Sequence, residues 1–141
     1  MIELKNPALY RHLTGLAGTF ETAKQLTLRN YNVSLTQRNF PYVDLFVQNP
    51  KTMKFVGVQV KAQRIANPGG FDLDTNKLNF PNLIVVLVAF KSKYNNDLPE
   101  YYIATAQEIK EAVVDGKRPG IPRRNLKPEW KDNWKLFDEL L

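Results

Sequence analysis

The sequence predicts an α/β fold, a single domain with a mixed central β-sheet flanked by helices. Three observations predict it: apolar residues recur first at helical spacing, then at every second position, and then in one continuous run of strand length. The chain has 141 residues, of which 43% are hydrophobic, and this is enough for one core without disulfides. We therefore expect one domain over residues 1–141.

A long helix is predicted near the N-terminus. Asn6 is a residue type that caps helices, and Pro7 suits the first helical position. Gly15 and Gly18 interrupt the pattern, and close packing against a sheet is the expected reason. The helix should end near Asn30. Its apolar residues recur at the spacing of an amphipathic helix: Leu9, Leu13, Leu16, Phe20 and Ala23.

Three short strands should follow the helix. Apolar residues alternate with polar ones over residues 31–35, and do so again over 43–47 and 56–60. Residues 49–52, Asn-Pro-Lys-Thr, have the composition of a turn. The second and third strands are therefore expected to form a hairpin.

A central strand is predicted in the second half of the chain. Residues 66–81 contain Pro-Gly-Gly and read as an irregular connection. The β-branched run over residues 83–90 is typical of a strand covered on both faces, which implies helices on both sides of the sheet. A short strand is expected at residues 101–103.

Two more helices complete the predicted order, α-β-β-β-β-β-α-α. Thr105 and Glu108 form a capping-box pattern that opens a helix, and Gly116 should close it. Residues 117–127 form a basic, proline-rich loop. Pro128 should then start a last helix, whose large apolar residues are Trp130, Trp134, Phe137 and Leu141.

Composition excludes several classes of chemistry. The chain has no cysteine, which removes thiolate catalysis and Cys-based zinc sites, and its single histidine argues against a Ser-His-Asp triad. The opening residues do not resemble a signal peptide, and the longest apolar run is far shorter than the roughly 20 residues that span a bilayer. We expect a cytoplasmic protein with no membrane partner.

The net charge of +6 is unevenly distributed. Residues 1–64 contain nine Lys or Arg against three acids, whereas residues 65–141 contain eleven of each. The whole excess therefore lies in the first part of the chain. A basic half-domain is the electrostatic footprint expected of a nucleic-acid-binding protein, and a charge of this size also serves solubility alone.

Three polar residues on the arms of the predicted hairpin can carry chemistry. Asp44 lies in Tyr-Val-Asp-Leu-Phe-Val on the first arm, and Gln59 and Lys61 lie in Val-Gln-Val-Lys-Ala on the second. Gln59 and Lys61 are two residues apart on a strand and must share one face. Carboxylate and amide oxygens are ligands for a hard cation such as Mg²⁺, and a nearby lysine can orient or help deprotonate a water. This is the equipment for metal-assisted phosphodiester hydrolysis.

The order and spacing of these residues resemble the Asp…(Glu/Gln)-x-Lys signature of the PD-(D/E)XK nuclease superfamily, which includes restriction-endonuclease-like and Holliday-junction-resolvase-like enzymes. The resemblance covers about residues 15–110 and implies an α-β-β-β core. It further implies that Asp44 and Gln59 hold Mg²⁺ or Mn²⁺ together with the backbone carbonyl of Val60, and that Lys61 orients the attacking water. DNA as substrate and a homodimer are expectations of the same resemblance.

Two departures from the family pattern bear on turnover. Many members carry a glutamate on the first helix directly after the glycine that we match to Gly18, and this position is Thr19 here. Glu21 lies roughly 200° further round the helix and cannot simply replace it. The second ligand, Gln59, is neutral, so a weaker metal site is expected.

Other interpretations therefore stay open. One is a nuclease fold that has lost turnover and binds DNA or a protein. Another is an unrelated α/β domain in which Asp44 and Lys61 form a salt bridge. Near the motif, we expect Gln63 and Arg64 to contact phosphates, together with Arg38 from the basic half. The arginines of the later loop, Arg118, Arg123 and Arg124, are a second candidate surface for nucleic acid.

Overall fold

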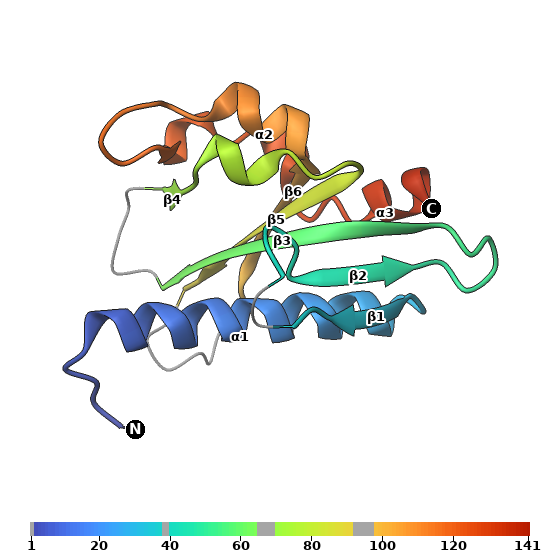
Figure 1. Ribbon diagram of the computed structural model, residues 1–141, viewed down its shortest axis with the longest axis horizontal. Helices are drawn as coiled ribbons and strands as arrows, with labels where there is room; N and C mark the ends of the chain where they lie inside the picture. The colour runs from blue at the N-terminus through green and yellow to red at the C-terminus, as the bar shows by residue number, and fades with distance from the viewer. Residues whose placement is uncertain (1, 38–39, 65–69, 92–97) are drawn as a thin grey trace.

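The structure is a computed structural model that describes residues 2–37, 40–64, 70–91 and 98–141 (Figure 1). It begins with the predicted long helix, α1 (Pro7–Leu28). The Asn6 side chain accepts hydrogen bonds from the backbone N–H groups of Ala8 and Leu9, at 2.9 and 3.3 Å. These bonds satisfy donors that have no partner inside the helix, as the Asn-Pro start predicted.

Five strands form the central sheet, and their spatial order is β1-β2-β3-β5-β6. β3 and β5 are parallel, whereas all the other neighbours are antiparallel. The mixed sheet and the β2–β3 hairpin are as predicted. The strands are β1 (Asn32–Leu35), β2 (Leu45–Gln48), β3 (Phe55–Arg64), β5 (Leu83–Phe90) and β6 (Glu100–Thr105).

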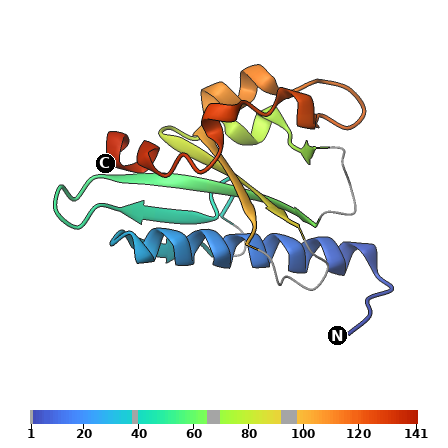
Figure 2. The same ribbon diagram turned by 180° about the vertical axis from the view of Figure 1, so that it is seen from behind.

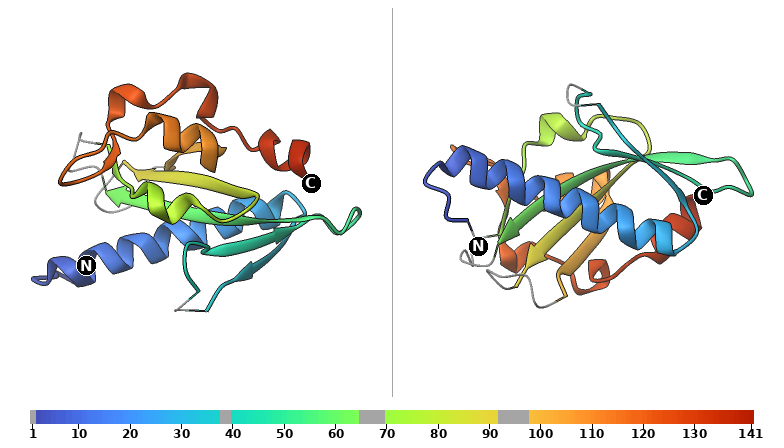
Figure 3. Two further views of the ribbon diagram at one scale, coloured as in Figure 1. Left: turned by 45° about the horizontal axis from the view of Figure 1, so that its top comes forward. Right: turned by 90° about the horizontal axis from the view of Figure 1, so that it is seen from below.

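Helices cover both faces of this sheet. α1 crosses one face, and α2 (Ala106–Ala112) covers part of the other, as the views from different sides show (Figure 3). Successive strand residues point to opposite faces of the sheet and so contribute to two apolar cores. Val58 and Val60 belong to the core on the α1 side, and Val85 belongs to the core beneath α2. All eight residues of β5 are buried, because both of its faces are covered.

Most of the apolar stripe of α1 does not face the sheet, although Ala23 packs against the core on the α1 side. Leu13 and Leu16 are more than one-third exposed, and Phe20 is 54% exposed. At Gly18 an added Cβ would lie 2.5 Å from the Cβ of Ala62 on β3, so helix and sheet are too close there for a larger side chain. The buried face of the helix consists of Thr14, Gly18, Thr22 and Leu26.

The prediction of one continuous last helix is wrong. A 3₁₀ turn, η3 (Pro128–Trp130), and a separate helix, α3 (Lys135–Leu140), replace it. Asp132, with φ of 50°, breaks the helix between them. The break has a packing reason, because Trp130 belongs to the core beneath α2 and Trp134 to the core on the α1 side. A single helix could not send both side chains to opposite faces of the sheet.

The end of the chain lies beside the β2–β3 hairpin (Figure 2). The hydroxyl of Thr52, in the turn of that hairpin, donates a 2.7 Å hydrogen bond to the backbone carbonyl of Leu141. Within the described residues, no helix is long and apolar enough to cross a membrane.

The predicted loops contain short elements. β4 (Phe71–Asp72) pairs with β7 (Gly120–Ile121) in a two-stranded ribbon, and the 3₁₀ turn η1 (Thr75–Leu78) follows β4. The capping box of α2 is present as predicted, but the helix ends at Ala112 and not at Gly116. It ends early because Val113 is extended and the chain then pairs back with β7.

Candidate active site

The β2–β3 hairpin places Asp44 opposite the middle of β3. Leu45 pairs with Val58, and the backbone N–H of Asp44 donates to the carbonyl of Val58 at 2.8 Å. From the other side, the backbone N–H of Thr36 donates to the carbonyl of Asp44 at 3.0 Å. The backbone at Asp44 is therefore held on both sides, which gives its side chain a defined origin.

The carboxylate of Asp44 bonds to β3 itself. One of its oxygens, Oδ2, accepts a 2.7 Å hydrogen bond from the backbone N–H of Val60. Burial raises the pKa of Asp44, while this hydrogen bond and the charge of Lys61 lower it. Among the described residues, no hydrogen bond is made to the other carboxylate oxygen, Oδ1, of the half-buried Asp44.

Gln59 lies on the face of β3 opposite to Val58 and Val60, because neighbouring strand residues point to opposite sides. It is 5% exposed. Its Oε1 atom is buried and has no hydrogen-bond partner among the residues that the structure describes. An unpaired buried acceptor costs about 1–3 kcal/mol, so a ligand that supplies positive charge there would relieve a real penalty.

Lys61 shares this face and is half-buried. Burial lowers its pKa, and the positive charge of Lys77 lowers it further. Negative charges on Asp44 and on two residues of the segment after β3, Asp72 and Asp74, act in the opposite direction. Four charged groups thus act on one amine, and three of them come from residues 66–81, which the sequence indicated only as an irregular connection.

The oxygen donors at this place fit a hard divalent cation. Asp44 Oδ1 and Gln59 Oε1, which have no hydrogen-bond partner among the described residues, are ligand types that Mg²⁺ and Mn²⁺ accept, and such ions keep several waters. Across the described part of the chain, no three His, Asp or Glu side chains form a metal-binding group. The two proposed side-chain donors, Asp44 and Gln59, carry one negative charge between them.

The first helix adds no carboxylate next to Asp44 in the structure. The hydroxyl of Thr19 donates to the carbonyl of Gly15, four residues earlier in α1, at 3.1 Å. Glu21 accepts a 3.2 Å hydrogen bond from the hydroxyl of Tyr101 on β6. Glu21 is thus engaged elsewhere, in agreement with its expected direction on the helix.

The three residues predicted to contact phosphates have different surroundings. Gln63 continues the alternation of β3 and lines a small cavity of about 20 Å³ with Tyr102 and Arg123. The guanidinium of Arg64 lies over the ring of Tyr10, 4.5 Å from its centre. Arg38 lies outside the described residues.

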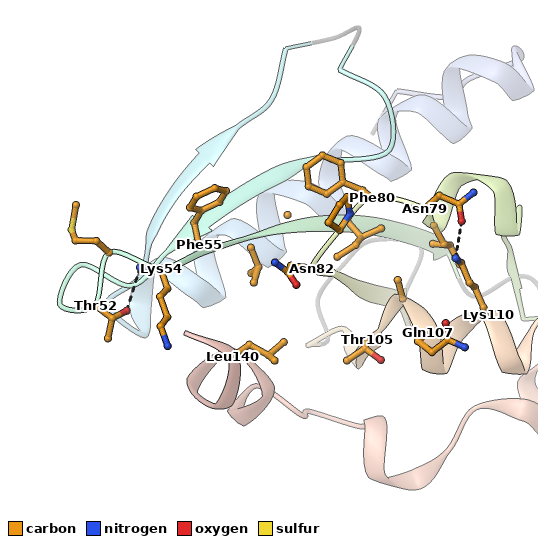
Figure 4. A pocket seen from close by; sticks show the side chains of 17 residues that line it. Thr52, Lys54, Phe55, Asn79, Phe80, Asn82, Thr105, Gln107, Lys110 and Leu140 are labelled. Carbon is orange, nitrogen blue, oxygen red and sulfur yellow. Dashed lines mark hydrogen bonds between the residues drawn. The ribbon is translucent and has the colours of Figure 1, made fainter.

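A larger cavity, which the sequence did not indicate, lies at the start of β3 (Figure 4). Its volume is about 770 Å³. Phe55 and Gly57 border it, two and one strand repeats before Gln59 on the same face. The alternation of Phe55, Gly57 and Gln59 could have indicated the cavity, because a strand places all three residues on one face and the glycine leaves space between the aromatic ring and the polar side chain.

Comparisons with known proteins bear on the fold. No protein-family model matches the chain, and no curated protein matches it. Among solved structures, the bacterial homing endonuclease I-Ssp6803I is similar, with a TM-score of 0.60 and 13% sequence identity over 91% of each chain. The predicted α/β fold is thus confirmed as nuclease-like, whereas at this identity the similarity assigns no role to any residue.

Proposed function

We propose that this protein is a metal-dependent endonuclease of the PD-(D/E)XK type that hydrolyses phosphodiester bonds in DNA. One observation carries the proposal. Gln59 and Lys61 share one face of β3, Asp44 bonds to the backbone of Val60 between them, and the buried Oε1 of Gln59 has no partner among the described residues. A purely structural glutamine at that position would leave its acceptor unpaired for no gain.

In this proposal, Asp44 and Gln59 hold Mg²⁺ or Mn²⁺ together with the backbone carbonyl of Val60. When bound, the ion supplies a Lewis acid that neutralises charge on the phosphate and lowers the pKa of a water. Lys61 orients the attacking water and stabilises the negative charge that develops on the phosphate.

DNA is the proposed partner because of the charge distribution. The excess of basic residues lies in the first 64 positions, which include α1 and the strand that carries Gln59 and Lys61. Gln63 and Arg64 continue that strand, and we propose that they contact phosphates beside the scissile bond, with Arg38. One such site per chain cuts one strand, so we propose a homodimer for cleavage of both.

Cleavage assays test the proposal directly. Supercoiled plasmid, single-stranded DNA and branched DNA are incubated with Mg²⁺ or Mn²⁺, with EDTA as the control. Lys61→Ala should abolish cutting, and Lys51→Ala, an exposed lysine in the β2–β3 turn, should leave it unchanged. Both variants should melt like the wild type.

A second candidate function is a nuclease fold without turnover that binds DNA. Thr19 in place of a helix glutamate favours it, together with the low negative charge around Asp44. In that case no substrate is cut by the folded protein with metal present. DNA binding would then survive Asp44→Asn, and this pair of results would replace the endonuclease proposal.

A further inference from the structure

We propose that the cavity at the start of β3 binds an unpaired nucleotide of the DNA, so that the substrate class is single-stranded or branched DNA. The inference rests on the proposed function, because it names the substrate of the same site. The cavity's volume of about 770 Å³ lies within the range of about 300–1,000 Å³ of small-molecule sites.

An aromatic platform borders this cavity. Phe55 is 62% exposed, although it lies on a strand, and Phe80 is half-buried. The rings of both residues pack edge-on against Phe46, with centre distances of 6.4 and 6.3 Å. The exposed ring of Phe55 thus has one aromatic neighbour, Phe46, which also packs on Phe80. An exposed aromatic face is the feature on which proteins stack unpaired bases.

The polar residues around the cavity complement a nucleotide. Lys54 and Lys110 bring positive charge, and none of the described residues that line the cavity carries a carboxylate. Lys110 donates a 2.7 Å hydrogen bond to the side-chain oxygen of Asn79. The side-chain amides of Asn82 and Gln107 also line the cavity (Figure 4). Lysines suit phosphates, and amides can pair with the edges of bases.

The cavity adjoins the candidate active site. Phe80 packs on Gly57, where an added Cβ would lie 3.2 Å from its ring and 3.3 Å from Val43. Gly57 precedes Gln59 by two residues on the same face of β3, or about 7 Å along the strand. Val43 directly precedes Asp44. A nucleotide in the cavity can thus belong to the strand whose phosphate lies at Asp44 and Gln59.

An unpaired base is required because stacking inside a duplex already covers both faces of each base. Phe55 can reach a base face only where the strand is single, frayed or branched. Exposed aromatic rings of this kind act without sequence preference, since every base has an aromatic face. Stacking in the cavity therefore selects the structure of the DNA and not its sequence.

A tryptophan reporter tests the inference without cleavage. In Phe55→Trp the new indole lies at the cavity, whereas the two native tryptophans, Trp130 and Trp134, are 1% and 8% exposed. A thymidine oligonucleotide is titrated in EDTA, alongside a hairpin duplex with the same number of phosphates. We expect the single strand to quench the fluorescence at a concentration at least about tenfold lower than the duplex.

Matched variants separate stacking from charge. By fluorescence anisotropy with a labelled single strand, Phe55→Ala should weaken binding about tenfold or more, as expected for one lost stacking contact. Lys54→Ala with Lys110→Ala should weaken it and reduce its salt dependence, whereas Lys51→Ala, which lies outside the cavity, should change it less. Phe55 is exposed, so its variants should fold, and circular dichroism checks this.

The outcomes distinguish this inference from the endonuclease proposal. Quenching by single strands without any cleavage would overturn the endonuclease proposal and leave the nucleotide site. Cleavage that is lost in Lys61→Ala, with no quenching or with equal quenching by duplex, would overturn the nucleotide site alone. An emission maximum of Phe55→Trp that shifts with protein concentration in the absence of DNA would identify a second copy of the chain in the cavity. That result would also overturn the nucleotide site.

Discussion

The Asp44 carboxylate accepts a 2.7 Å hydrogen bond from the backbone N–H of Val60, the residue between Gln59 and Lys61. β2 begins only at Leu45, which pairs with Val58, so a side chain takes the place of a strand partner at Val60. The position of the carboxylate is therefore coupled to the strand that carries the other two polar residues.

Two substitutions at Asp44 separate its structural role from its chemical one. Asp44→Ala removes the acceptor for the N–H of Val60, and we expect the free energy of unfolding to fall by about 1–3 kcal/mol. Asp44→Asn keeps an acceptor oxygen and removes a charge that burial disfavours, so its stability should stay within about 1 kcal/mol of the wild type. Urea denaturation at neutral pH measures both.

Cleavage should respond differently from stability in these variants. Both should lose metal-dependent cutting, because neither retains the charged ligand. Equal stability losses in Asp44→Ala and Asp44→Asn would contradict the assigned role of the Val60 hydrogen bond. Cutting by Asp44→Asn at the wild-type rate would remove Asp44 from the proposed metal site.

Substitutions at Gln59 should change the stability of the metal-free protein and its metal binding in opposite directions. Gln59→Leu removes the buried Oε1, which has no partner among the described residues. Without metal, the free energy of unfolding of this variant should therefore equal or exceed that of the wild type. In Gln59→Glu a buried carboxylate is introduced, which should destabilise the metal-free protein and strengthen the binding of Mn²⁺. Thermal melting with and without Mn²⁺ measures both effects.

The result for Gln59→Leu decides between two interpretations of this glutamine. A gain in stability together with loss of cutting is expected of a residue kept for chemistry. A loss of more than about 2 kcal/mol in the metal-free protein would instead indicate that the Gln59 amide holds the fold together.

Much of the fold could be predicted from local patterns. The Asn-Pro start, the alternation in the hairpin and the buried run of β5 each carry a signal of a few residues, and the structure has these elements near the expected bounds. The shared face of Gln59 and Lys61 follows from strand geometry alone. What the patterns could not supply depends on contacts between distant segments.

Three features illustrate that limit. The stripe with Leu16 and Phe20 looked like the packed side of α1, but the fit of Gly18 against Ala62 decided which side is buried. The last helix broke because its two tryptophans pack in different cores. The influence of the segment after β3 on Lys61 likewise requires the closed fold.

The close approach of Gly18 to Ala62 predicts that a larger residue at position 18 destabilises the protein. In Gly18→Ala the new Cβ meets that of Ala62 at 2.5 Å, so helix and sheet must move apart. We expect a loss of about 1–3 kcal/mol, although alanine is the better helix former. Ala62→Gly in the same chain should restore part of the loss, and denaturant unfolding of the double-mutant cycle measures the coupling. Additive effects would contradict the contact.

The two sides of α1 should respond differently to truncation. Leu26 is fully buried in the core on the α1 side, and Leu26→Ala should cost about 2–5 kcal/mol. Phe20 is mostly exposed, and Phe20→Ala should change the free energy of unfolding by less than about 1 kcal/mol. Measurements at two protein concentrations serve as the control for association. A large loss in Phe20→Ala at low concentration would place this ring in the core after all.

Tyr31 should make the protein sensitive to alkali. Its hydroxyl donates to the carboxylate of Asp138 on α3, and burial, followed by this bond and the charge of Asp138, raises its pKa above the ordinary value of 10.0. A folded-state pKa above the unfolded value means that the contribution to stability is fully present below about pH 10 and is lost as the pH rises towards the folded-state pKa. Tyr31→Phe should therefore cost about 1 kcal/mol at pH 7 and less at pH 11, so that the two stability curves converge. Urea unfolding between pH 7 and 11 measures this, and parallel curves would show that the Tyr31 hydroxyl does not titrate differently in the folded and unfolded chains.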